Sequence, residues 1–334
     1  MTKKALLVGI DAYKNLRALG GCVADVKALR PLLERHADNK RNYECYTLLG
    51  EKGHSRKRVT RKALREGLRK LFADPGEVLF YFSGHGAVTE TGGYLATYEA
   101  ERDDWGIPMQ EVIERACSKE SRASHILLVL DCCYSGEIGD APLLNTPHTN
   151  NPLSVLRQNM TIIAASRDYQ SAVEANGHGL FTTAVLDALD GGAADHMGWV
   201  TAPSVYAYVE RRFNGWQQRP VYKTHATELA VVRECAPLIE RMKLRDLVKY
   251  FPQPDHRYQL DPAYDPEDEF GNVKGRRNEG KIAVGRLFKQ YRDAGLLKAT
   301  VSGEDFYWVA RRCHTVELTP RGREYWWLVT QERI

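Results

Sequence analysis

The first two thirds of the chain alternate short, mostly apolar runs with amphipathic stretches. Runs of five to seven residues predict buried strands, because a strand that is covered on both faces needs apolar side chains on both. Between these runs, apolar residues recur at helical spacing, which predicts helices. The predicted strands are 5–10, 43–49, 77–82, 125–130, 161–165 and 227–232, and the predicted helices are 23–33, 59–72, 180–189 and 204–213.

Strands that alternate with helices are typical of an α/β fold, in which a mainly parallel sheet carries helices on both faces. Residues 137–157 interrupt the pattern with prolines, asparagines and few apolar residues. Such a stretch predicts an exposed loop, here between two halves of one sheet. We therefore expect a single α/β domain over residues 1–236.

Residues 237–334 follow a different pattern. A proline-rich connection leads into a helical pattern over 282–297. Residues 298–302 and 306–311 predict the two strands of a hairpin, with 303–305 as its turn. Thr319 and Pro320 then predict the start of a final helix, because proline fits the first helical turn. We expect a second, small α+β domain here.

Composition narrows the class of protein. The 334 residues include 47 basic and 43 acidic residues, a balance that gives no indication of nucleic-acid or membrane binding. The seven cysteines show no disulfide or zinc-site spacing, which favours a reducing compartment. The first apolar run ends at Asp11, too early for a signal peptide or a membrane span. We expect a cytoplasmic protein with no membrane association.

Two reactive residues follow predicted strands directly. His85 comes after the strand 77–82 and Cys133 after the strand 125–130. Parallel strands bring such residues to one edge of the sheet, where α/β proteins bind ligands. A thiol nucleophile needs a base such as an imidazole to become a thiolate. The pattern therefore predicts that Cys133 attacks a carbonyl and that His85 moves the proton through Nδ1 or Nε2.

Glycines beside both residues suit this chemistry. They allow tight turns and a close approach of substrate, and backbone N–H groups there can hold an oxyanion. We expect the amides of Gly86 and Cys133 to do so. Either motif alone is more often structural: Gly-His-Gly is usually a turn, and a cysteine at a strand end is usually an inert core residue. A histidine about fifty residues before a cysteine, each after a buried strand, is far more specific.

The runs Y-F-S-G-H-G and L-V-L-D-C-C-Y-S-G together resemble the paired signature of metacaspases and their bacterial caspase-like relatives. Asp131, Cys133, Ser135 and Gly136 match the D-x-C-H-S-G form of the motif, whereas Tyr134 replaces its histidine. Weaker likenesses extend the resemblance over residues 3–235. It implies a caspase-hemoglobinase-like fold with a six-stranded sheet. It also implies endopeptidase activity on protein substrates, with no cofactor required for the chemistry.

The resemblance further implies cleavage after Arg or Lys, since metacaspases line the first substrate pocket with acidic residues. A carboxylate pair suits a guanidinium, which can bind bidentately. The alternative for Asp25 is a charge that favours a helix N-terminus. The alternative for Asp131 is an orienting hydrogen bond to a backbone turn. The matching pocket positions are Cys22, Asp25, Ser83 and Asp131, with Asp168 as a further residue at the rim.

Many metacaspases need calcium, which prefers several oxygen ligands. Asp140 matches one family position, and Asp103 and Asp104 belong to an acidic cluster that could supply others. The alternative for that cluster is a solvated acidic loop. Arg157, beside the loop 137–157, is a candidate site of self-cleavage.

Residues 237–334 resemble a winged-helix domain in their helix, hairpin and L-T-P-R-G phrase. Winged helices bind DNA or act as protein-interaction modules, and basic residues near Arg277 could contact phosphates. Basic and acidic residues nearly cancel here, so we favour an adaptor that couples the peptidase to an activating or sensor protein, in a bacterial defence or cell-death pathway. The rival hypotheses are a winged-helix regulator whose caspase-like half is a scaffold, and a separase-like or CHAT peptidase with another pocket.

Overall fold

The protein is described here by a computed structural model. The described residues are 2–53, 58–89, 92–102, 104–132, 156–165, 179–213, 220–266 and 278–334. The chain divides into two compact units, Met1–Ala236 and Pro237–Ile334. Within the described ranges, no helix is long and apolar enough to cross a membrane.

A six-stranded sheet forms the centre of the first unit, in the order β10-β8-β7-β3-β1-β2. Five strands run parallel, and β10 pairs antiparallel with β8 at one edge. The mainly parallel α/β sheet expected from the sequence is confirmed. Its strands are β1 (Lys3–Ile10), β2 (Glu44–Gly50), β3 (Gly76–Ser83), β7 (Ala123–Asp131), β8 (Met160–Ala164) and β10 (Val221–His225).

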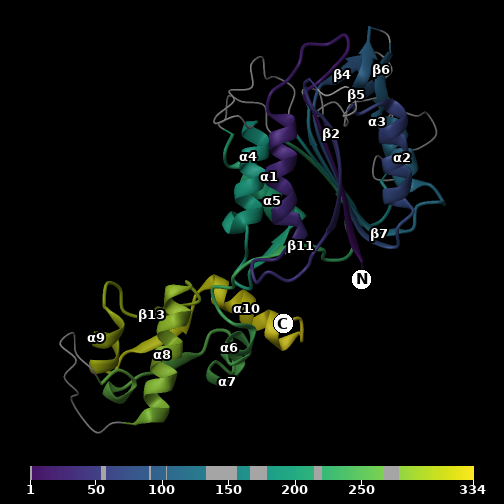
Figure 1. The fold of residues 1–334 in the computed structure, drawn as a ribbon. Helices are drawn as coiled ribbons and strands as arrows, with labels where there is room; N and C mark the ends of the chain where they lie inside the picture. The colour runs from purple at the N-terminus through teal and green to yellow at the C-terminus, as the bar shows by residue number, and fades with distance from the viewer. Residues whose placement is uncertain are drawn as a thin grey trace. The chain divides into compact units, whose positions relative to one another are not determined.

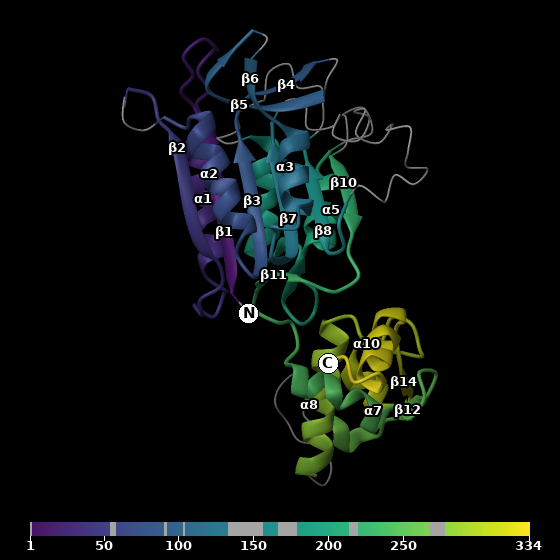
Figure 2. The ribbon, with the colours of Figure 1, turned by 90° about the vertical axis from the view of Figure 1, so that its right-hand side faces the viewer.

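Helices cover both faces of this sheet (Figures 1 and 2). Each face buries its own apolar core, because side chains alternate between the two sides of every strand. Leu6 and Val8 pack with α2 and α3, whereas Ala5 and Leu7 pack on the side of α1, α4 and α5. The helices are α1 (Cys22–Glu34), α2 (Arg61–Phe72), α3 (Met109–Cys117), α4 (Leu180–Asp187) and α5 (Ala202–Glu210).

Two small sheets extend the unit, and neither was predicted from the sequence. β4 (Gly86–Thr89), β5 (Gly92–Glu101) and β6 (Asp104–Pro108) form an antiparallel sheet beyond the carboxyl end of β3 (Figure 2). β9 (Trp199–Thr201) pairs with β11 (Val231–Glu234). The strand expected over 227–232 thus begins at Val231 and lies outside the main sheet. The edge strand β10 was missed because V-Y-K-T-H is only partly buried and carries no apolar run.

In its described residues, the second unit packs α-helices around a three-stranded antiparallel sheet of order β12-β14-β13. Its core is aromatic, with Phe251, Phe288 and Tyr291 fully buried. The elements are α6 (Arg241–Arg245), α7 (Leu247–Tyr250), β12 (Arg257–Gln259), α8 (Glu279–Asp293), β13 (Leu297–Ala299), α9 (Phe306–Arg311), β14 (Thr315–Leu318) and α10 (Pro320–Thr330).

The hairpin predicted in this unit is wrong in its second strand. Residues 306–311 form the helix α9, because the Asp305 side chain accepts the N–H of Tyr307 as an N-cap. Phe306, Val309 and Ala310 are buried, at the i, i+3 and i+4 spacing of one helix face. The first strand, β13, pairs with β14 instead. The final helix begins as predicted, with Thr319 capping α10.

The closest approach of α1 to the sheet depends on Gly9, and its replacement by alanine is expected to destabilise the first unit. A Cβ there would lie 2.3 Å from the Cys22 carbonyl oxygen, so α1 would have to move away from β1. We expect a loss of about 1–3 kcal/mol in the free energy of unfolding. Denaturant titration of Gly9→Ala measures this loss.

Gly93→Ala is the matched control for this prediction. A Cβ at that position would have Met109 Cγ as its nearest contact, at 3.8 Å, which is ordinary packing distance. Both substitutions restrict the unfolded chain similarly. Equal stabilities of the two variants would contradict the argument.

Candidate active site

The ends of β3 and β7 lie side by side, directly before the two predicted reactive residues in the sequence. Ser83 and Asp131 are paired in the parallel ladder, and Gly84 N donates to the Asp131 carbonyl at 3.2 Å. His85 follows Ser83 by two positions, and Cys133 follows Asp131 by two. Cys133 itself lies outside the described residues. β3 and β7 therefore end side by side, at paired residues.

The turns that follow these strands also pack against each other. A Cβ placed on Gly86 would lie 3.4 Å from both Cβ and Sγ of Cys132. Glycine thus allows the strand β4 to approach the residue directly before Cys133. This contact places the Gly86 backbone beside Cys132, the last described residue before position 133.

The imidazole of His85 is held from the segment between β1 and α1. Its Nε2 lies 2.7 Å from the carbonyl oxygen of Arg17. A carbonyl can only accept, so Nε2 carries the proton in this arrangement. Nδ1 is then the ring nitrogen that is left able to accept a proton. The backbone N–H of His85 donates to Tyr13 Oη at 2.8 Å.

Sequence reasoning missed both supports of His85. Arg17 contributes through its backbone carbonyl, and no side-chain pattern reveals such a contact. Tyr13 ends the run K-A-L-L-V-G-I-D-A-Y, but its distance in sequence from His85 hides the contact. Only the return of the chain over the ends of β1 and β3 brings them together.

The residues expected to line the first substrate pocket form one cluster, apart from Asp168, which lies outside the described residues. Ser83 Oγ donates to Asp25 Oδ2 at 3.0 Å, and the Cys22 thiol bonds to the Ser83 side chain. Asp25 is in the first turn of α1, as the helix-charge alternative requires, yet it is only 2% exposed. Burial and nearby carboxylates raise the pKa of the Cys22 thiol well above its usual value, which keeps it protonated.

Two hydroxyl groups orient the Asp131 carboxylate, one by direct contact and the other through the first. Thr182 Oγ1, on α4, donates to Asp131 Oδ2 at 2.5 Å. Tyr81 Oη lies 2.6 Å from the same Thr182 oxygen. Because Thr182 uses its own proton on the carboxylate, the tyrosine must donate to it. Neither hydroxyl was identified from the sequence, and together they set the direction in which the Asp131 carboxylate points.

Burial dominates the electrostatics of this carboxylate. Burial and, to a smaller extent, the nearby charge of Asp25 raise the pKa of Asp131 to about 6, against the opposing effect of the hydrogen bonds from Thr182. A bound cation would reverse the effect by favouring the ionised form. A positive charge that binds beside Asp131 would therefore stabilise its ionised carboxylate.

The sequence predicts three further residues as calcium ligands and Arg157 as a site of self-cleavage. Asp104 forms an ion pair with Arg61 at 2.6 Å, and Asp103 and Asp140 lie outside the described residues. Over the described part of the chain, no group of three or more acidic, His or Cys side chains is placed to hold a metal ion. The calcium site stays a prediction. Arg157 Nη1 donates to Ser121 Oγ at 3.0 Å and to the Ala116 carbonyl at 3.3 Å.

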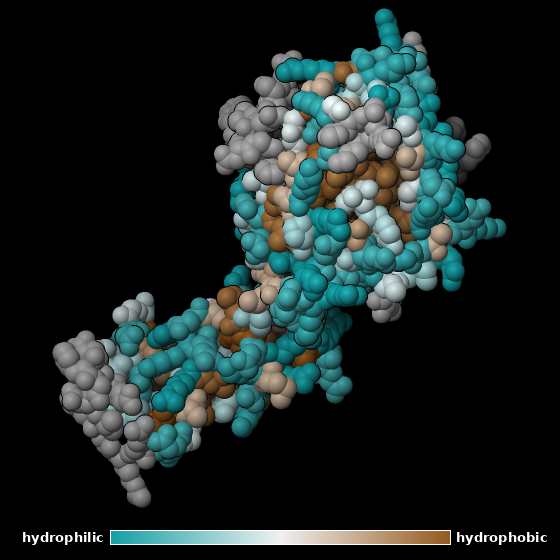
Figure 3. Space-filling model, viewed as in Figure 1, coloured by the Kyte–Doolittle hydropathy of each residue, from teal (hydrophilic) through white to brown (hydrophobic). Residues whose placement is uncertain are grey.

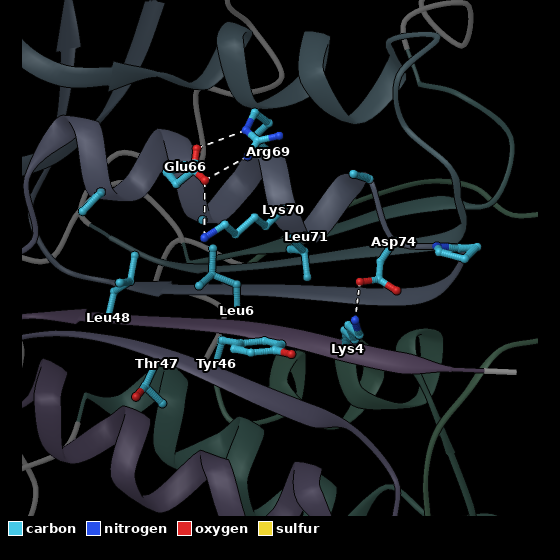
Figure 4. A pocket seen from close by; sticks show the side chains of 14 residues that line it. Lys4, Leu6, Tyr46, Thr47, Leu48, Glu66, Arg69, Lys70, Leu71 and Asp74 are labelled. Carbon is cyan, nitrogen blue, oxygen red and sulfur yellow. Dashed lines mark hydrogen bonds and ion pairs between the residues drawn. The ribbon is translucent and has the colours of Figure 1, made fainter.

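A cavity of about 720 Å³ lies elsewhere in the unit, between α2 and the sheet edge at β2 (Figure 4). Apolar side chains gather over this edge of the sheet, with polar ones around them (Figure 3). Leu6, Leu48 and Leu71 line the cavity, and Lys4 forms an ion pair with Asp74 beside it. None of the predicted catalytic or pocket residues lines it, so it is separate from the candidate site.

A mainly parallel sheet that presents a histidine turn and a cysteine turn at one edge is the arrangement of caspase-like cysteine peptidases. A family model for the caspase domain, Peptidase_C14, matches residues 2–231. The chain belongs to this family of cysteine peptidases. Their catalysis requires no cofactor, in agreement with the expectation from the sequence.

Similar proteins of known name are metacaspases. The chain is 32% identical to metacaspase-6 of Arabidopsis thaliana over 161 residues, covering 42% of this chain and 40% of that protein. It is 27% identical to metacaspase-1 of Schizosaccharomyces pombe, covering 51% and 43%. It is 32% identical to metacaspase-3 of Trypanosoma cruzi, covering 42% of each chain. The chain spans about two fifths of the length of these relatives.

The raised pKa of Asp131 is expected to make the free protein less stable as pH rises. The unfolded carboxyl ionises near 3.8 and the folded one near 6, so the folded state binds the proton more tightly. The contribution of the neutral acid is present at low pH and is lost as pH rises through about 6. Asp131→Asn removes this effect. Its stability relative to wild type should improve by about 2.4 kcal/mol between pH 4 and pH 7.

Denaturant titrations of both proteins at several pH values test this expectation. Asp187→Asn provides the control, since it neutralises an exposed carboxylate that pairs with Arg212. That variant should track the wild type without a comparable rise. Parallel pH profiles for Asp131→Asn and wild type would show that the buried carboxyl does not titrate as described.

Proposed function

We propose that the chain is a cysteine endopeptidase that cleaves after Arg or Lys, with Cys133 as nucleophile and His85 as base. The observation that carries the proposal is the pairing of Ser83 with Asp131, which starts both reactive turns from matched points on adjacent strands. The matches to metacaspases support it further. The same dyad in a separase-like or CHAT peptidase would not require the acidic pocket cluster.

The proposed reaction uses His85 twice. Nδ1 takes the thiol proton as Cys133 Sγ bonds to the carbonyl carbon, and the backbone amides of Gly86 and Cys133 hold the oxyanion. The protonated imidazole then gives its proton to the leaving amine as the peptide bond breaks. His85 next deprotonates water, which hydrolyses the thioester and releases the acid product. The Arg17 carbonyl stabilises the imidazolium through Nε2–H in both stages.

We infer basic specificity from the carboxylate cluster. Asp25 and Asp131 lie in one buried polar group, and the hydroxyls of Ser83 and Thr182 orient them. A guanidinium can engage both carboxylates with several charge-assisted hydrogen bonds. Its arrival would favour ionisation of Asp131, so binding of the substrate releases a proton at pH values near and below 6. Cys22 and Asp168 complete the proposed pocket.

We propose that the second unit is a winged-helix-like adaptor for an activating or sensor protein. Its antiparallel sheet and helices support this, as do the exposed Trp308 and Trp327, at 51% and 46% exposure. Tyr325 belongs to the core instead, and Trp326 Nε1 donates to the Phe251 carbonyl. A cytoplasmic bacterial defence or cell-death setting completes the proposal and rests on resemblance alone.

Nucleic acid is the less favoured partner of this unit. Two of its basic side chains are already neutralised: Lys281 pairs with Asp261, and Lys289 pairs with Asp265. A phosphate would have to compete with these carboxylates. Arg276 and Arg277, also considered for phosphate contacts, lie outside the described residues.

Calcium dependence and self-cleavage after Arg157 stay predictions. Asp104 forms an ion pair with Arg61, with which a calcium ion at that position would have to compete. Cleavage after Arg157 would require its side chain to leave Ser121 and the Ala116 carbonyl. Both can be followed in the assay that tests the peptidase itself.

Fluorogenic peptides with Arg, Lys, Asp or Asn before the scissile bond test the proposed activity. We expect turnover of the Arg and Lys peptides by wild type and none by Cys133→Ala or His85→Ala, because the dyad supplies nucleophile and base. Assays with calcium and with chelator measure the metal requirement. Cys313→Ala removes an exposed cysteine in the other unit and should retain activity.

Each other outcome has a distinct meaning. Turnover of Asp peptides would keep the dyad and overturn the pocket assignment. Turnover that survives Cys133→Ala would remove the proposed mechanism. If the wild type turns over no peptide even with its activating partner, the result would favour the rival hypothesis, in which the caspase-like half is a scaffold for a winged-helix regulator.

Asp25→Asn tests the basic pocket separately from the dyad. The amide oxygen can still accept the Ser83 hydroxyl, so the local structure should persist while the charge is lost. We expect kcat/KM for Arg peptides to fall by about tenfold to a hundredfold, mostly through KM, since hydrogen bonds to charged groups contribute about 1.5–3 kcal/mol. Reactivity of Cys133 towards iodoacetamide should stay unchanged. An unaltered kcat/KM would place the guanidinium elsewhere.

A further inference from the structure

The segment between β1 and α1 is anchored at several points along its length. Asp11 N and Ala12 N both donate to the Gly50 carbonyl at 3.0 Å. Leu19 N donates to the Asp11 carbonyl at 2.9 Å, and Cys22 N donates to Asp11 Oδ1 at 3.0 Å. These bonds tie the segment to the sheet and to the start of α1. A side chain placed on it can therefore act as a fixed reference point.

Tyr13 extends from this segment to the histidine turn. It is only 9% exposed, and its Oη accepts the backbone N–H of His85 at 2.8 Å. Its ring centroid lies 4.8 Å from that of His85, with the planes inclined at 53°. A Cβ on Gly84 would come within 2.7 Å of Tyr13 Oη. The lack of a side chain at Gly84 is thus what allows the hydroxyl to reach the next residue's amide.

We propose that Tyr13 is a positioning residue for His85. Its hydroxyl fixes the backbone of the 84–86 turn, so that the imidazole meets the Arg17 carbonyl through Nε2 and keeps Nδ1 for Cys133. The inference rests on the proposed function of the Cys133 and His85 pair. It adds a residue that acts through the base and does not touch the substrate.

The surrounding contacts explain why loss of the hydroxyl would displace the turn without unfolding it. The His85 carbonyl still accepts Ala96 N at 3.0 Å, and Gly84 N still donates to Asp131. The amide of His85 would lose the partner that the Tyr13 hydroxyl supplies. Burial raises the pKa of Tyr13 well above its usual value, so the hydroxyl stays neutral across the working pH range.

The pH dependence of Cys133 alkylation by iodoacetamide tests the proposal without any substrate. Wild type should react at acidic pH, because a positioned imidazole lowers the apparent pKa of the thiol. In Tyr13→Phe that pKa should rise by about one unit, which lowers alkylation about tenfold at pH values below both pKa values. The Cys133 peptide is quantified by mass spectrometry. In peptide assays, kcat should fall about tenfold to a hundredfold with KM little changed.

Tyr43→Phe is the matched control. It removes the hydroxyl of another buried tyrosine, 5% exposed, at the start of β2 and away from the histidine turn. Its alkylation profile should coincide with that of wild type. Thermal unfolding of all variants is recorded alongside, so that a shifted profile in a stably folded protein is separated from simple destabilisation.

A double-mutant cycle sharpens the assignment to the hydroxyl. Gly84→Ala places a methyl group against Tyr13 Oη, so it should shift the alkylation profile in the same direction as Tyr13→Phe. In the Tyr13→Phe background the oxygen is absent, and the further effect of Gly84→Ala should be smaller than in wild type. Strictly additive effects would contradict the proposal.

The outcomes separate this inference from the proposed function. If His85→Ala shifts the alkylation profile but Tyr13→Phe does not, the dyad stands and the role of Tyr13 is overturned. If wild type and His85→Ala react alike, with the profile of an ordinary thiol, the dyad itself fails and the role of Tyr13 fails with it. A shift in Tyr13→Phe but not in Tyr43→Phe supports the proposal.

Discussion

The parallel pairing of β3 with β7 is the interaction on which the candidate site depends. The register of the two strands sets Ser83 opposite Asp131, where both strands end. A slip of one residue would turn every side chain of one strand to the other face. The fully buried Phe80, Phe82, Leu128 and Leu130 make such a slip costly. The apolar core thus determines the relative position of the two polar turns.

The same strand ends also carry the acidic cluster, so recognition and chemistry share one scaffold. Ser83 precedes the histidine turn and orients Asp25, while Asp131 precedes the cysteine turn and is oriented by Thr182. Burial of carboxylates disfavours their charge, and the raised pKa of Asp131 is the sign of that cost. A bound cation offsets the cost beside the reacting groups. Binding of a basic side chain would thereby act on the residues next to the dyad.

The sequence predicted the central sheet well, because buried parallel strands show as apolar runs and the helices between them show helical spacing. It also identified Asp25, Ser83 and Asp131, which the structure places together. Prediction from the sequence failed for segments whose structure depends on contacts with other parts of the chain. The run 306–311 is apolar enough for a strand, but the cap at Asp305 and the packing of Val309 make it a helix. The edge strand β10 has no apolar run of its own.

The groups that sequence could not identify act mostly through backbone atoms or across long separations. Arg17 contacts His85 through its backbone carbonyl. Gly84 leaves space for the Tyr13 hydroxyl because it has no side chain. Thr182 contacts Asp131 through a hydroxyl on α4, about fifty residues further along the chain. None of these roles changes the pattern of apolar and polar residues. A nucleophile and a base are visible in sequence because their chemistry needs particular side chains. The groups that orient them are not visible in the sequence. Orientation needs only a hydrogen-bond donor, an acceptor or an empty space at the right place, and many residue types can supply any of these.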